Sequence, residues 1–525
     1  MPEFLRALAY ILVVSVPALY VGGKIAVPII GAAEFRLWRN CWLLATVITF
    51  FSRGFFDFAV ALALMSIYVH RYSRQPAFLY MVLMFVAPCV PIPSGIPGIL
   101  NKILELDPPR WLAITILLPA ALRLWRDRDI REFRGLDVLV VAFVGYTSLL
   151  SVRLEDFNSV LRVLAGNFLD ICLPYFVFSR VIRSGLDMNK ALLAFAIGVL
   201  PLSAIGGLEI WKSWRVYYVV VQEWDVFLKT AYLFRDGLLR ASTTSIEAIA
   251  FGFVCMTGAG CLLALRSPAP LGIWRYVALC ILVLGLFSSV SRGPWLGFAL
   301  CVFFLAITSP KRSFQLALAS LPGIVAVLFL RPPFLDRFIN LLPFVGSADK
   351  SSETYRSSLF ENSLTVINRY PLFGSYSFLK EPEMQAMIQG QGIIDIVNTY
   401  LQVALYYGLI GLFLFILYFF GVTAKLTRKS LGDNSDTVNY KAVLGLLIAM
   451  LLVIVTTSSV SVIPYIYWTF SAMCAAILAP GFAGDREYLP QQGPKPLKVL
   501  GSISPLARHD SLDDGRKKMR VLGTH

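Results

Sequence analysis

Charge, histidine and paired cysteines are scarce in this chain of 525 residues. Only 15% of the residues are charged, whereas soluble domains carry about 25%, so an ordinary soluble protein is excluded. The eight cysteines show no CxxC spacing and all lie in or beside apolar segments, where cysteine is usually a small hydrophobic residue. The sequence therefore predicts no metal site and no disulfide framework, and we expect no cofactor.

Histidine is limited to His70, His509 and His525. Under the span prediction given below, all three histidines fall on the cytoplasmic side of a membrane. A reaction on the opposite side would therefore need a carboxylate as its general base, because no imidazole is available there.

Long hydrophobic runs make up most of the chain instead: 57% of the residues are hydrophobic and the mean hydropathy is +0.70. Apolar runs of about 20 residues, the length that crosses a bilayer, recur from end to end. The sequence therefore predicts an all-α polytopic integral membrane protein with about 12–14 transmembrane helices. The expected spans are 7–30, 41–69, 76–94, 111–125, 136–152, 158–182, 189–209, 244–265, 274–290, 293–309, 314–330, 397–424, 440–458 and 461–480. The run 41–69 is interrupted by Ser52-Arg53-Gly54, which predicts a broken or tilted helix.

Basic residues determine the expected orientation. Five arginines lie in the loop 123–134, and further Lys and Arg residues fill 425–441 and the tail after Phe482. By the positive-inside rule these segments are cytoplasmic, which places both termini inside a bacterial inner membrane. The net charge of +15 is explained by these loops, so we expect no nucleic-acid partner.

Two domains follow from this pattern: a polytopic membrane domain over 1–484, and a basic tail over 485–525 that is predicted to be disordered. Two long segments then face the periplasm, 210–243 and the large loop 331–396. Within the large loop, Ser352 can cap an amphipathic helix with apolar positions at Tyr355, Leu359, Val366 and Ile367, which Pro371 and Gly374 end.

Three arginines fall on the predicted periplasmic side: Arg240, Arg292 in the turn Ser291-Arg292-Gly293, and Arg356. A guanidinium is always charged and its planar fork of donors matches phosphate. Each arginine alone fits interfacial snorkelling, but three together indicate an anionic, phosphorylated substrate.

Carboxylates on the same side are the candidate bases. Asp395 lies two residues before a hydrophobic helix that opens at Val397, at the membrane boundary, where desolvation raises a pKa toward a useful range. An N-cap or helix-dipole role is the alternative for Asp395. The other outer carboxylates are Glu361, Asp349, Glu353 and Glu247.

Three motifs in a fixed order resemble the O-antigen ligase and O-antigen polymerase superfamily. The first is the Ser-Arg-Gly turn within 287–297. The second is an outer-loop arginine, here Arg356, followed by Pro-Leu-Phe-Gly at 371–374. The third is Val397-Asn-Thr-Tyr-Leu-Gln402 with a trailing Gly-Leu pair in 407–412, similar to a His-Asn-x-Tyr-Leu motif. The resemblance covers about 275–425, with Arg240 as an upstream member.

The resemblance implies an activity and roles for these residues. The family transfers glycans from an undecaprenyl-pyrophosphate carrier at the outer face of the inner membrane. Three arginines matching the pyrophosphate would offset its charge without a metal. Arg240, Arg292 and Arg356 would bind the pyrophosphate, with Ser291 beside them. Asn398 and Tyr400 would position the sugar or support the helix end. Val397 stands where the ligase motif has histidine, so Asp395 is the candidate replacement as catalytic base or as orienter of the acceptor.

The sequence thus favours a glycan polymerase or ligase of surface or exopolysaccharide biosynthesis. Its partners would be a lipid-linked glycan donor, a glycan acceptor, the bilayer and other polysaccharide-assembly proteins. An O-antigen ligase acting on a lipid A–core acceptor is one alternative. A transporter or flippase is another, although transporters place ionisable residues near mid-membrane and show paired halves, and no convincing internal repeat is seen here.

Overall fold

The computed structural model describes residues 2–73, 75–96, 100–126, 135–226, 234–235, 237–267, 271–308, 350–389, 392–432 and 438–482. The predicted span 314–330, the candidate base Asp349 and the basic tail 485–525 lie outside these residues. The description below concerns the unit that ends at Asp485.

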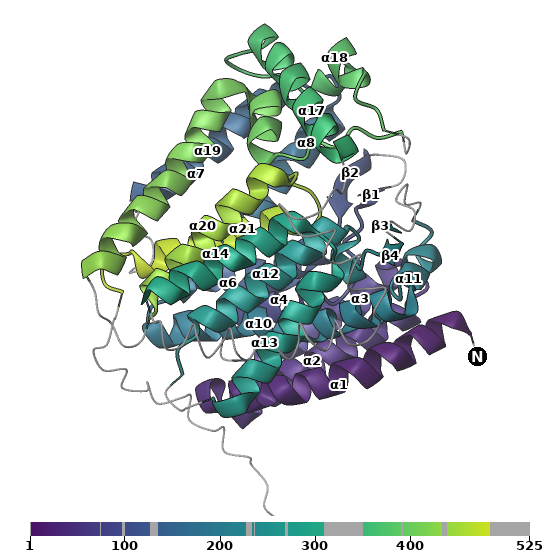
Figure 1. The fold of residues 1–525 in the computed structure, drawn as a ribbon, viewed down its shortest axis with the longest axis vertical. Helices are drawn as coiled ribbons and strands as arrows, with labels where there is room; N and C mark the ends of the chain where they lie inside the picture. The colour runs from purple at the N-terminus through teal and green to yellow at the C-terminus, as the bar shows by residue number, and fades with distance from the viewer. Residues whose placement is uncertain are drawn as a thin grey trace, which may run out of the picture. The chain divides into compact units, whose positions relative to one another are not determined.

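Helices form almost all of the N-terminal half (Figure 1). Two helices contain a π-helical stretch, Ala113–Leu117 between α5 and α6 and Asn167–Cys172 between α8 and α9. The elements are α1 (Glu3–Ile30), α2 (Ala32–Phe51), α3 (Phe55–Tyr72), α4 (Pro76–Leu83), β1 (Ile92–Ile96), β2 (Leu100–Leu106), α5 (Pro108–Leu112), α6 (Leu118–Arg126), α7 (Gly135–Leu150), α8 (Phe157–Gly166), α9 (Leu173–Val181), α10 (Gly185–Lys212) and α11 (Tyr218–Glu223).

The C-terminal half continues the helical pattern after a short antiparallel pair of strands. Its elements are β3 (Phe234–Arg235), β4 (Leu238–Leu239), α12 (Ala248–Ala264), α13 (Gly272–Ser288), α14 (Arg292–Thr308), α17 (Lys350–Arg369), α18 (Pro382–Gln385), α19 (Thr399–Gly432), α20 (Tyr440–Val453) and α21 (Ile463–Ile477). The only other strands in the described part of the chain are β1 and β2, which form an antiparallel hairpin.

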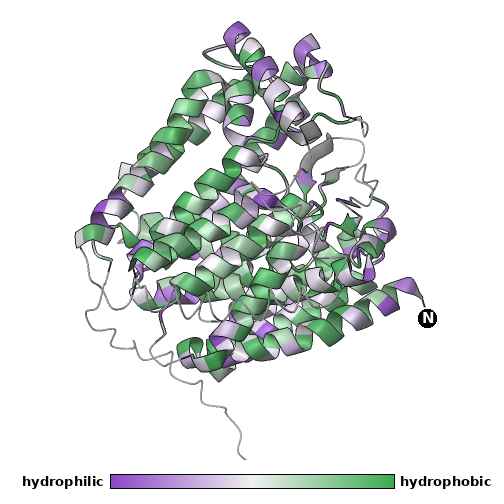
Figure 2. Cartoon of the chain, in the orientation of Figure 1, coloured by the Kyte–Doolittle hydropathy of each residue, from purple (hydrophilic) through white to green (hydrophobic). Residues whose placement is uncertain are grey.

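The apolar character of these helices confirms the all-α polytopic class (Figure 2). Among the described residues, six helices are long and apolar enough to cross a membrane, and five shorter ones of 10–17 residues are also apolar. The central helix α10 packs against α1, α4, α12 and α13 and is almost completely buried, so it forms the middle of the core. A helix that is apolar on all sides is expected only in such a central position.

Two predicted spans differ from the structure in the N-terminal region. The run 41–69 becomes the antiparallel pair α2 and α3, which is broken at the Ser52–Gly54 interruption. The span 76–94 is helical only to Leu83; a turn and bend follow over 84–87, and β1 begins at Ile92. Prolines at 88, 91 and 93 explain the second difference, because each lacks an N–H and restricts the residue before it.

The split of 41–69 into two helices changes the position of the N-terminus. The Phe4 ring contacts the Phe51 ring, and Arg6 stacks on Trp214 just after α10. Lys429 at the end of α19 donates to the carbonyl of Ile477 (2.7 Å), at the other end of the helices. The start of α1 and the end of α21 therefore lie at opposite ends of the helices.

The expected amphipathic helix in the large loop is present as α17. Leu359, Val366 and Ile367 are buried, in a small apolar cluster shared with the segment before α19. Ser352 lies inside the first turn of α17 rather than at its cap, because the helix begins at Lys350. The periodicity of the apolar positions located this helix correctly.

Candidate functional site

Two turns that are far apart in sequence meet around Arg240. The Arg240 guanidinium donates to the Ser291 hydroxyl (2.9 Å) and to the Ser289 carbonyl (3.5 Å). The backbone N–H of Ala241 donates to the Ser288 carbonyl (3.0 Å). Because Arg292 opens α14 directly after Ser291, the structure brings Arg240, Ser291 and Arg292 to one region.

A buried carboxylate holds the segment that carries Arg240. Glu209, near the end of α10, is fully buried and accepts N–H bonds from Val216 (3.1 Å), Ser242 (3.0 Å) and Thr243 (3.0 Å). A buried carboxylate without such partners would be costly. Glu209 therefore ties the turn after Arg240 to the central helix, and the sequence prediction missed this role.

Backbone strain gathers in the same segments. Thr243, Ile246, Val290 and Ser461 have positive φ angles of 46°, 66°, 47° and 53°. Left-handed backbone is unfavourable for β-branched residues and costs about 1–3 kcal/mol for each strained position. Such strain persists only where the surrounding contacts enforce it, and it is common at functional sites.

Asp395 lies in the extended segment before α19 and is fixed from two sides. The Ser458 hydroxyl donates to its Oδ1 atom (3.2 Å). The Tyr355 hydroxyl of α17 donates to the Asp395 backbone carbonyl (3.0 Å) and accepts from its N–H (3.2 Å). Arg356 follows Tyr355 in α17, so the two hydrogen bonds of Tyr355 also hold Arg356 close to the Asp395 segment. Asp395 does not cap α19.

The charges of four residues act on one another here, and we call them the arginine–carboxylate cluster: Arg240, Glu247, Arg356 and Asp395. Burial raises the pKa of Asp395, whereas the Ser458 hydrogen bond and the charges of Arg356 and Arg240 lower it. Burial and the charge of Asp395 raise the pKa of Glu247 to about 7, and Arg240 opposes this shift. The cluster therefore contains one carboxyl that titrates near neutral pH beside a second carboxyl under the influence of two guanidinium groups.

The remaining residues of the 397–402 motif serve the helix rather than the cluster. The Asn398 side chain accepts N–H bonds from Tyr400 (2.9 Å) and Leu401 (3.1 Å), so it caps α19. The Tyr400 hydroxyl donates to the Leu451 carbonyl of α20 (3.2 Å). Val397 packs against the apolar cluster under α17. The helix-support role expected for Asn398 is therefore present, and Tyr400 connects two helices.

The segment 456–461, between α20 and α21, was not singled out from the sequence. Besides the Ser458 bond to Asp395, its Ser461 hydroxyl donates to the Ser245 carbonyl (2.8 Å). The Ser459 N–H donates to the Gln402 side chain (2.8 Å). These bonds join the turn that bears Glu247 to the start of α19. A run of hydroxyl residues between two apolar helices, Thr-Thr-Ser-Ser-Val-Ser, was the available signal.

The Pro-Leu-Phe-Gly motif docks into a break in α19. The Leu409 N–H donates to the Pro371 carbonyl (2.7 Å), and the Ser375 N–H donates to the Leu405 carbonyl (2.8 Å). Gly408 has φ +70°, and a Cβ atom there would lie 2.2 Å from the Leu372 carbonyl oxygen. Only glycine permits this backbone approach, so the motif positions α17, and with it Arg356, on α19.

Helix α7 and the 3-10 turn after it, Ser151–Arg153, reinforce this junction. The Arg153 guanidinium donates to the carbonyls of Phe373 (2.8 Å) and Gly374 (3.1 Å). The Tyr146 hydroxyl lies within hydrogen-bonding distance of the Leu372 carbonyl (3.1 Å) and the Tyr407 carbonyl (3.0 Å). Helix α19 and the region 146–153 therefore both fix the segment that follows α17.

Other candidates lie away from the cluster or outside the described chain. Glu361 is exposed on α17, and Glu353 falls in its first turn. His70 contacts the Thr115 carbonyl through its ring nitrogen (3.0 Å), near the end of α3 that lies far from the cluster. Within the described ranges, no three His, Cys, Asp or Glu side chains gather where they could hold a metal ion.

Comparison with known proteins adds one match. The family model described as O-antigen ligase matches residues 277–416, which include Ser291, Arg292, Arg356 and Asp395. No curated protein matches the chain. The family implies a bacterial membrane enzyme that transfers a glycan from a lipid-linked donor to an acceptor. The resemblance seen in the sequence is confirmed for residues 277–416, which match the O-antigen ligase family model.

Proposed function

We propose that this protein is an inner-membrane glycan polymerase that uses an undecaprenyl-pyrophosphate-linked oligosaccharide as donor. An acceptor hydroxyl attacks the anomeric carbon of the donor, the bond from that carbon to the pyrophosphate oxygen breaks, and the lipid pyrophosphate departs. The observation that carries this proposal is the arginine–carboxylate cluster, which combines two guanidinium groups and two carboxyls in one partly buried place.

Arg240, Arg292 and Arg356 bind the pyrophosphate and stabilise the charge that it gains as it leaves. Preorganised cations at the place where charge develops lower the barrier most when their positions are already fixed. Arg240 is fixed by Ser291, and Arg356 follows the Tyr355 clamp. Three cations would offset the pyrophosphate charge without a metal ion.

Asp395 accepts the proton of the attacking hydroxyl. In the free protein, Arg240 and Arg356 favour its ionised form and so weaken it as a base. A bound pyrophosphate would offset these two positive charges, which raises the pKa of Asp395 when the donor is in place. Burial already raises the pKa of Asp395 in the free protein, and donor binding would strengthen this carboxylate further as a base.

Basic residues support an orientation in which the cluster faces the periplasm. Helix ends away from the cluster carry many exposed or half-buried Lys and Arg side chains, and the positive-inside rule assigns such an end to the cytoplasm. These basic residues are Arg36, Arg39, Arg71, Arg123, Arg126, Arg183, Lys425 and Arg428. Both the cluster and the N-terminal end of α1 would then be periplasmic.

Val397 favours a polymerase over a ligase that transfers to lipid A–core. The ligase motif has histidine at this position, whereas Val397 is packed in the apolar cluster under α17. A transporter is less consistent with the structure, because the candidate cations and carboxyls lie in turns and helix ends rather than in the middle of the helices.

The test is reconstitution of the purified protein in liposomes with a lipid-pyrophosphate oligosaccharide. A polymerase lengthens the glycan on its lipid carrier in the presence of EDTA, with release of undecaprenyl pyrophosphate. Transfer only to added lipid A–core would identify a ligase. If the intact donor crosses the bilayer and no new glycosidic bond forms, the protein is a transporter rather than an enzyme.

A further inference from the structure

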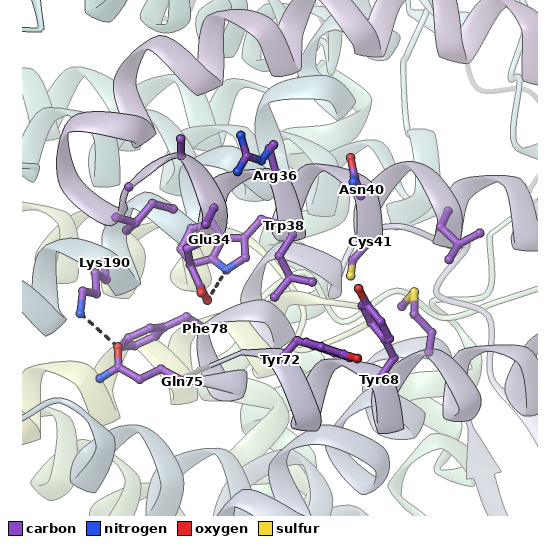
Figure 3. A pocket seen from close by; sticks show the side chains of 17 residues that line it. Glu34, Arg36, Trp38, Asn40, Cys41, Tyr68, Tyr72, Gln75, Phe78 and Lys190 are labelled. Atoms are coloured by element: carbon purple, nitrogen blue, oxygen red, sulfur yellow. Dashed lines mark hydrogen bonds between the residues drawn. The ribbon is translucent and has the colours of Figure 1, made fainter. Parts of the chain in front are cut away.

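Strained backbone gathers at one end of the helical bundle. At the opposite end, around the open hollow between α2 and α3, polar side chains bond one another: Lys190 donates to Gln75 (3.3 Å) and Trp38 donates to Glu34 (3.3 Å) (Figure 3). Among the described residues, the non-glycine positions with a positive φ angle all lie at the end where α10 stops and Arg240 is found. They are Ser213, Asp225, Thr243, Ile246, Val290 and Ser461.

Ile246, directly before Glu247, is the centre of a strained turn. Its φ and ψ angles are 66° and −40°, and the Glu247 N–H donates to the Ser245 carbonyl (2.7 Å). These are the features of a γ-turn with a positive central φ angle, which is rare and strained. A β-branched residue makes a positive φ angle still less favourable. Contacts from outside the turn must therefore hold Ile246 in this conformation.

Arg215 supplies such a contact. Its guanidinium donates to the Ile246 carbonyl (2.8 Å), and only 5% of the residue is exposed. A hydrogen bond from a charged donor is stronger than one between neutral groups, so it can offset the strain. Glu209 holds the start of the same turn through the N–H groups of Ser242 and Thr243. A buried carboxylate and a buried guanidinium therefore hold the turn at its two ends.

The same arrangement recurs on the other side of Arg240. Val290 is β-branched, has a φ angle of 47° and directly precedes Ser291 and Arg292. The Arg235 guanidinium donates to the Val290 carbonyl (3.3 Å). Two separate turns beside Arg240 thus contain a strained, β-branched residue whose carbonyl accepts a bond from an arginine.

We propose that Arg215 and Arg235 are positioning residues for glycan transfer. Each arginine holds the strained peptide that precedes a site residue, Glu247 in one turn and Ser291 in the other. This role rests on the function proposed above. The family model matches residues 277–416, so both arginines come from a part of the chain outside the match and hold parts of the site from there.

The first test is hydrogen–deuterium exchange of the full-length protein in detergent, which needs no activity. Arg215→Gln should raise the exchange rate of the amides in 241–247 roughly tenfold, because the turn loses a charge-assisted bond. The matched control is Arg275→Gln at the other end of α12, where the guanidinium donates to the carbonyls of Leu262 (2.8 Å) and Leu263 (3.0 Å) at the end of a regular helix. This control should leave exchange over 241–247 unchanged. Unchanged exchange in Arg215→Gln would overturn the proposal.

The second test separates positioning from stability by the rate of glycan extension in liposomes. Arg215→Gln should lower kcat/KM roughly tenfold, whereas Arg275→Gln should not. Glycine adopts a positive φ angle without strain, so Arg215→Gln/Ile246→Gly should regain most of this activity. Its melting temperature should nevertheless fall below that of Arg215→Gln, because a buried isoleucine is lost. A merely structural Arg215 predicts that the less stable double variant is also the less active one.

The outcomes keep the two proposals apart. If the wild type extends glycan and the double variant is no more active than Arg215→Gln, positioning is overturned and the proposed function stands. A wild type that extends no glycan overturns the proposed function and the positioning role with it, whatever the exchange rates. Arg235→Gln with Val290→Gly repeats the rescue at the second turn, and its failure there overturns the role of Arg235.

Discussion

Both ends of the helical bundle carry arginines, yet their surroundings differ. At one end Arg240 and Arg356 act on the carboxyls of Asp395 and Glu247, and strained, hydroxyl-rich turns lie beside Arg240 and Glu247. At the other end Arg36 is exposed on the regular helix α2. The comparison shows that an arginine near a membrane surface does not by itself indicate catalysis; our proposal of a catalytic site rests on the neighbouring carboxyls and the fixed backbone.

The largest expected effect is loss of the proposed base. Asp395→Asn keeps the size of the side chain and removes its basicity, so turnover should fall about 10²–10⁴-fold, the usual contribution of a positioned base. The measurement is the rate of glycan extension in liposomes, beside donor binding. Glu361→Gln, an exposed carboxyl of α17, is the control and should remain active.

Full activity of Asp395→Asn would assign the base elsewhere. Glu247→Gln is then the decisive variant, because Glu247 titrates near neutral pH and faces the same cluster. If both variants turn over normally, transfer proceeds without these carboxyls and the transporter alternative gains support.

The next prediction tests whether the arginines at the cluster need the planar guanidinium group or only its positive charge. Arg356→Lys and Arg292→Lys keep the charge but lose the planar fork, and a lost contact to a desolvated phosphate costs about 2–4 kcal/mol, or roughly 30- to 1000-fold in rate. The matched control is Arg369→Lys on the same helix α17, where the arginine pairs with Glu381 and Glu383 instead. If both test variants extend glycan at near-normal rates and at normal protein levels, these arginines serve only to anchor the protein at the membrane surface.

The segment after α17 packs on α19 at Gly408. A substitution of Gly408 should therefore displace α17 and, with it, Arg356 in the cluster. Gly408→Ala requires a Cβ at φ +70° and 2.2 Å from a backbone oxygen, so we expect a loss of about 2–4 kcal/mol of stability or displacement of α17. Gly421→Ala on the same helix meets only ordinary contacts at 3.6 Å and should be neutral or stabilising. Melting temperature and activity are the two measurements, and equal behaviour of the two variants would contradict the docking role.

Glu247 makes a smaller, pH-dependent prediction. Its pKa of about 7 lies above the ordinary value, so the group is neutral at lower pH and becomes negative as the pH rises through 7. A negative charge near the pyrophosphate should then raise the donor KM by roughly fivefold, equivalent to a like-charge penalty of about 1 kcal/mol. Glu247→Gln should flatten this rise in KM and leave kcat nearly unchanged. A loss of kcat in this variant, with a wild-type kcat that increases through pH 7, would make Glu247 the base.

The smallest effect on activity is expected from probes of topology. Single cysteines at Glu3 and Ser377 should react with an impermeant thiol reagent added outside the inner membrane, and a cysteine at Arg428 should not. The native cysteines of the described chain are buried or half-buried, which keeps the background low. Labelling of position 428 alone would reverse the assignment of the two ends.

Local patterns in the sequence predicted much of the fold. Apolar runs located most helices because burial in lipid or protein demands them, and the period of Leu359, Val366 and Ile367 located α17. One failure has its cause in tertiary structure. Whether the break at Ser52–Gly54 is a kink or a hairpin depends on the packing of α2 and α3, and that choice sets the end of the bundle at which α1 begins.

The sequence by itself determined the membrane class, the family segment and the residue types that can bind pyrophosphate. Only the tertiary structure decided that Arg240 bonds Ser291, which lies 51 residues later, and that Ser458 bonds Asp395. It also decided that Glu209 holds the turn after Arg240. It also showed that Asn398 is a cap and that Gly408 is a docking position. The physical reason is that charge–charge interaction and hydrogen bonding act over a few ångströms in space, and distance along the chain carries no information about them.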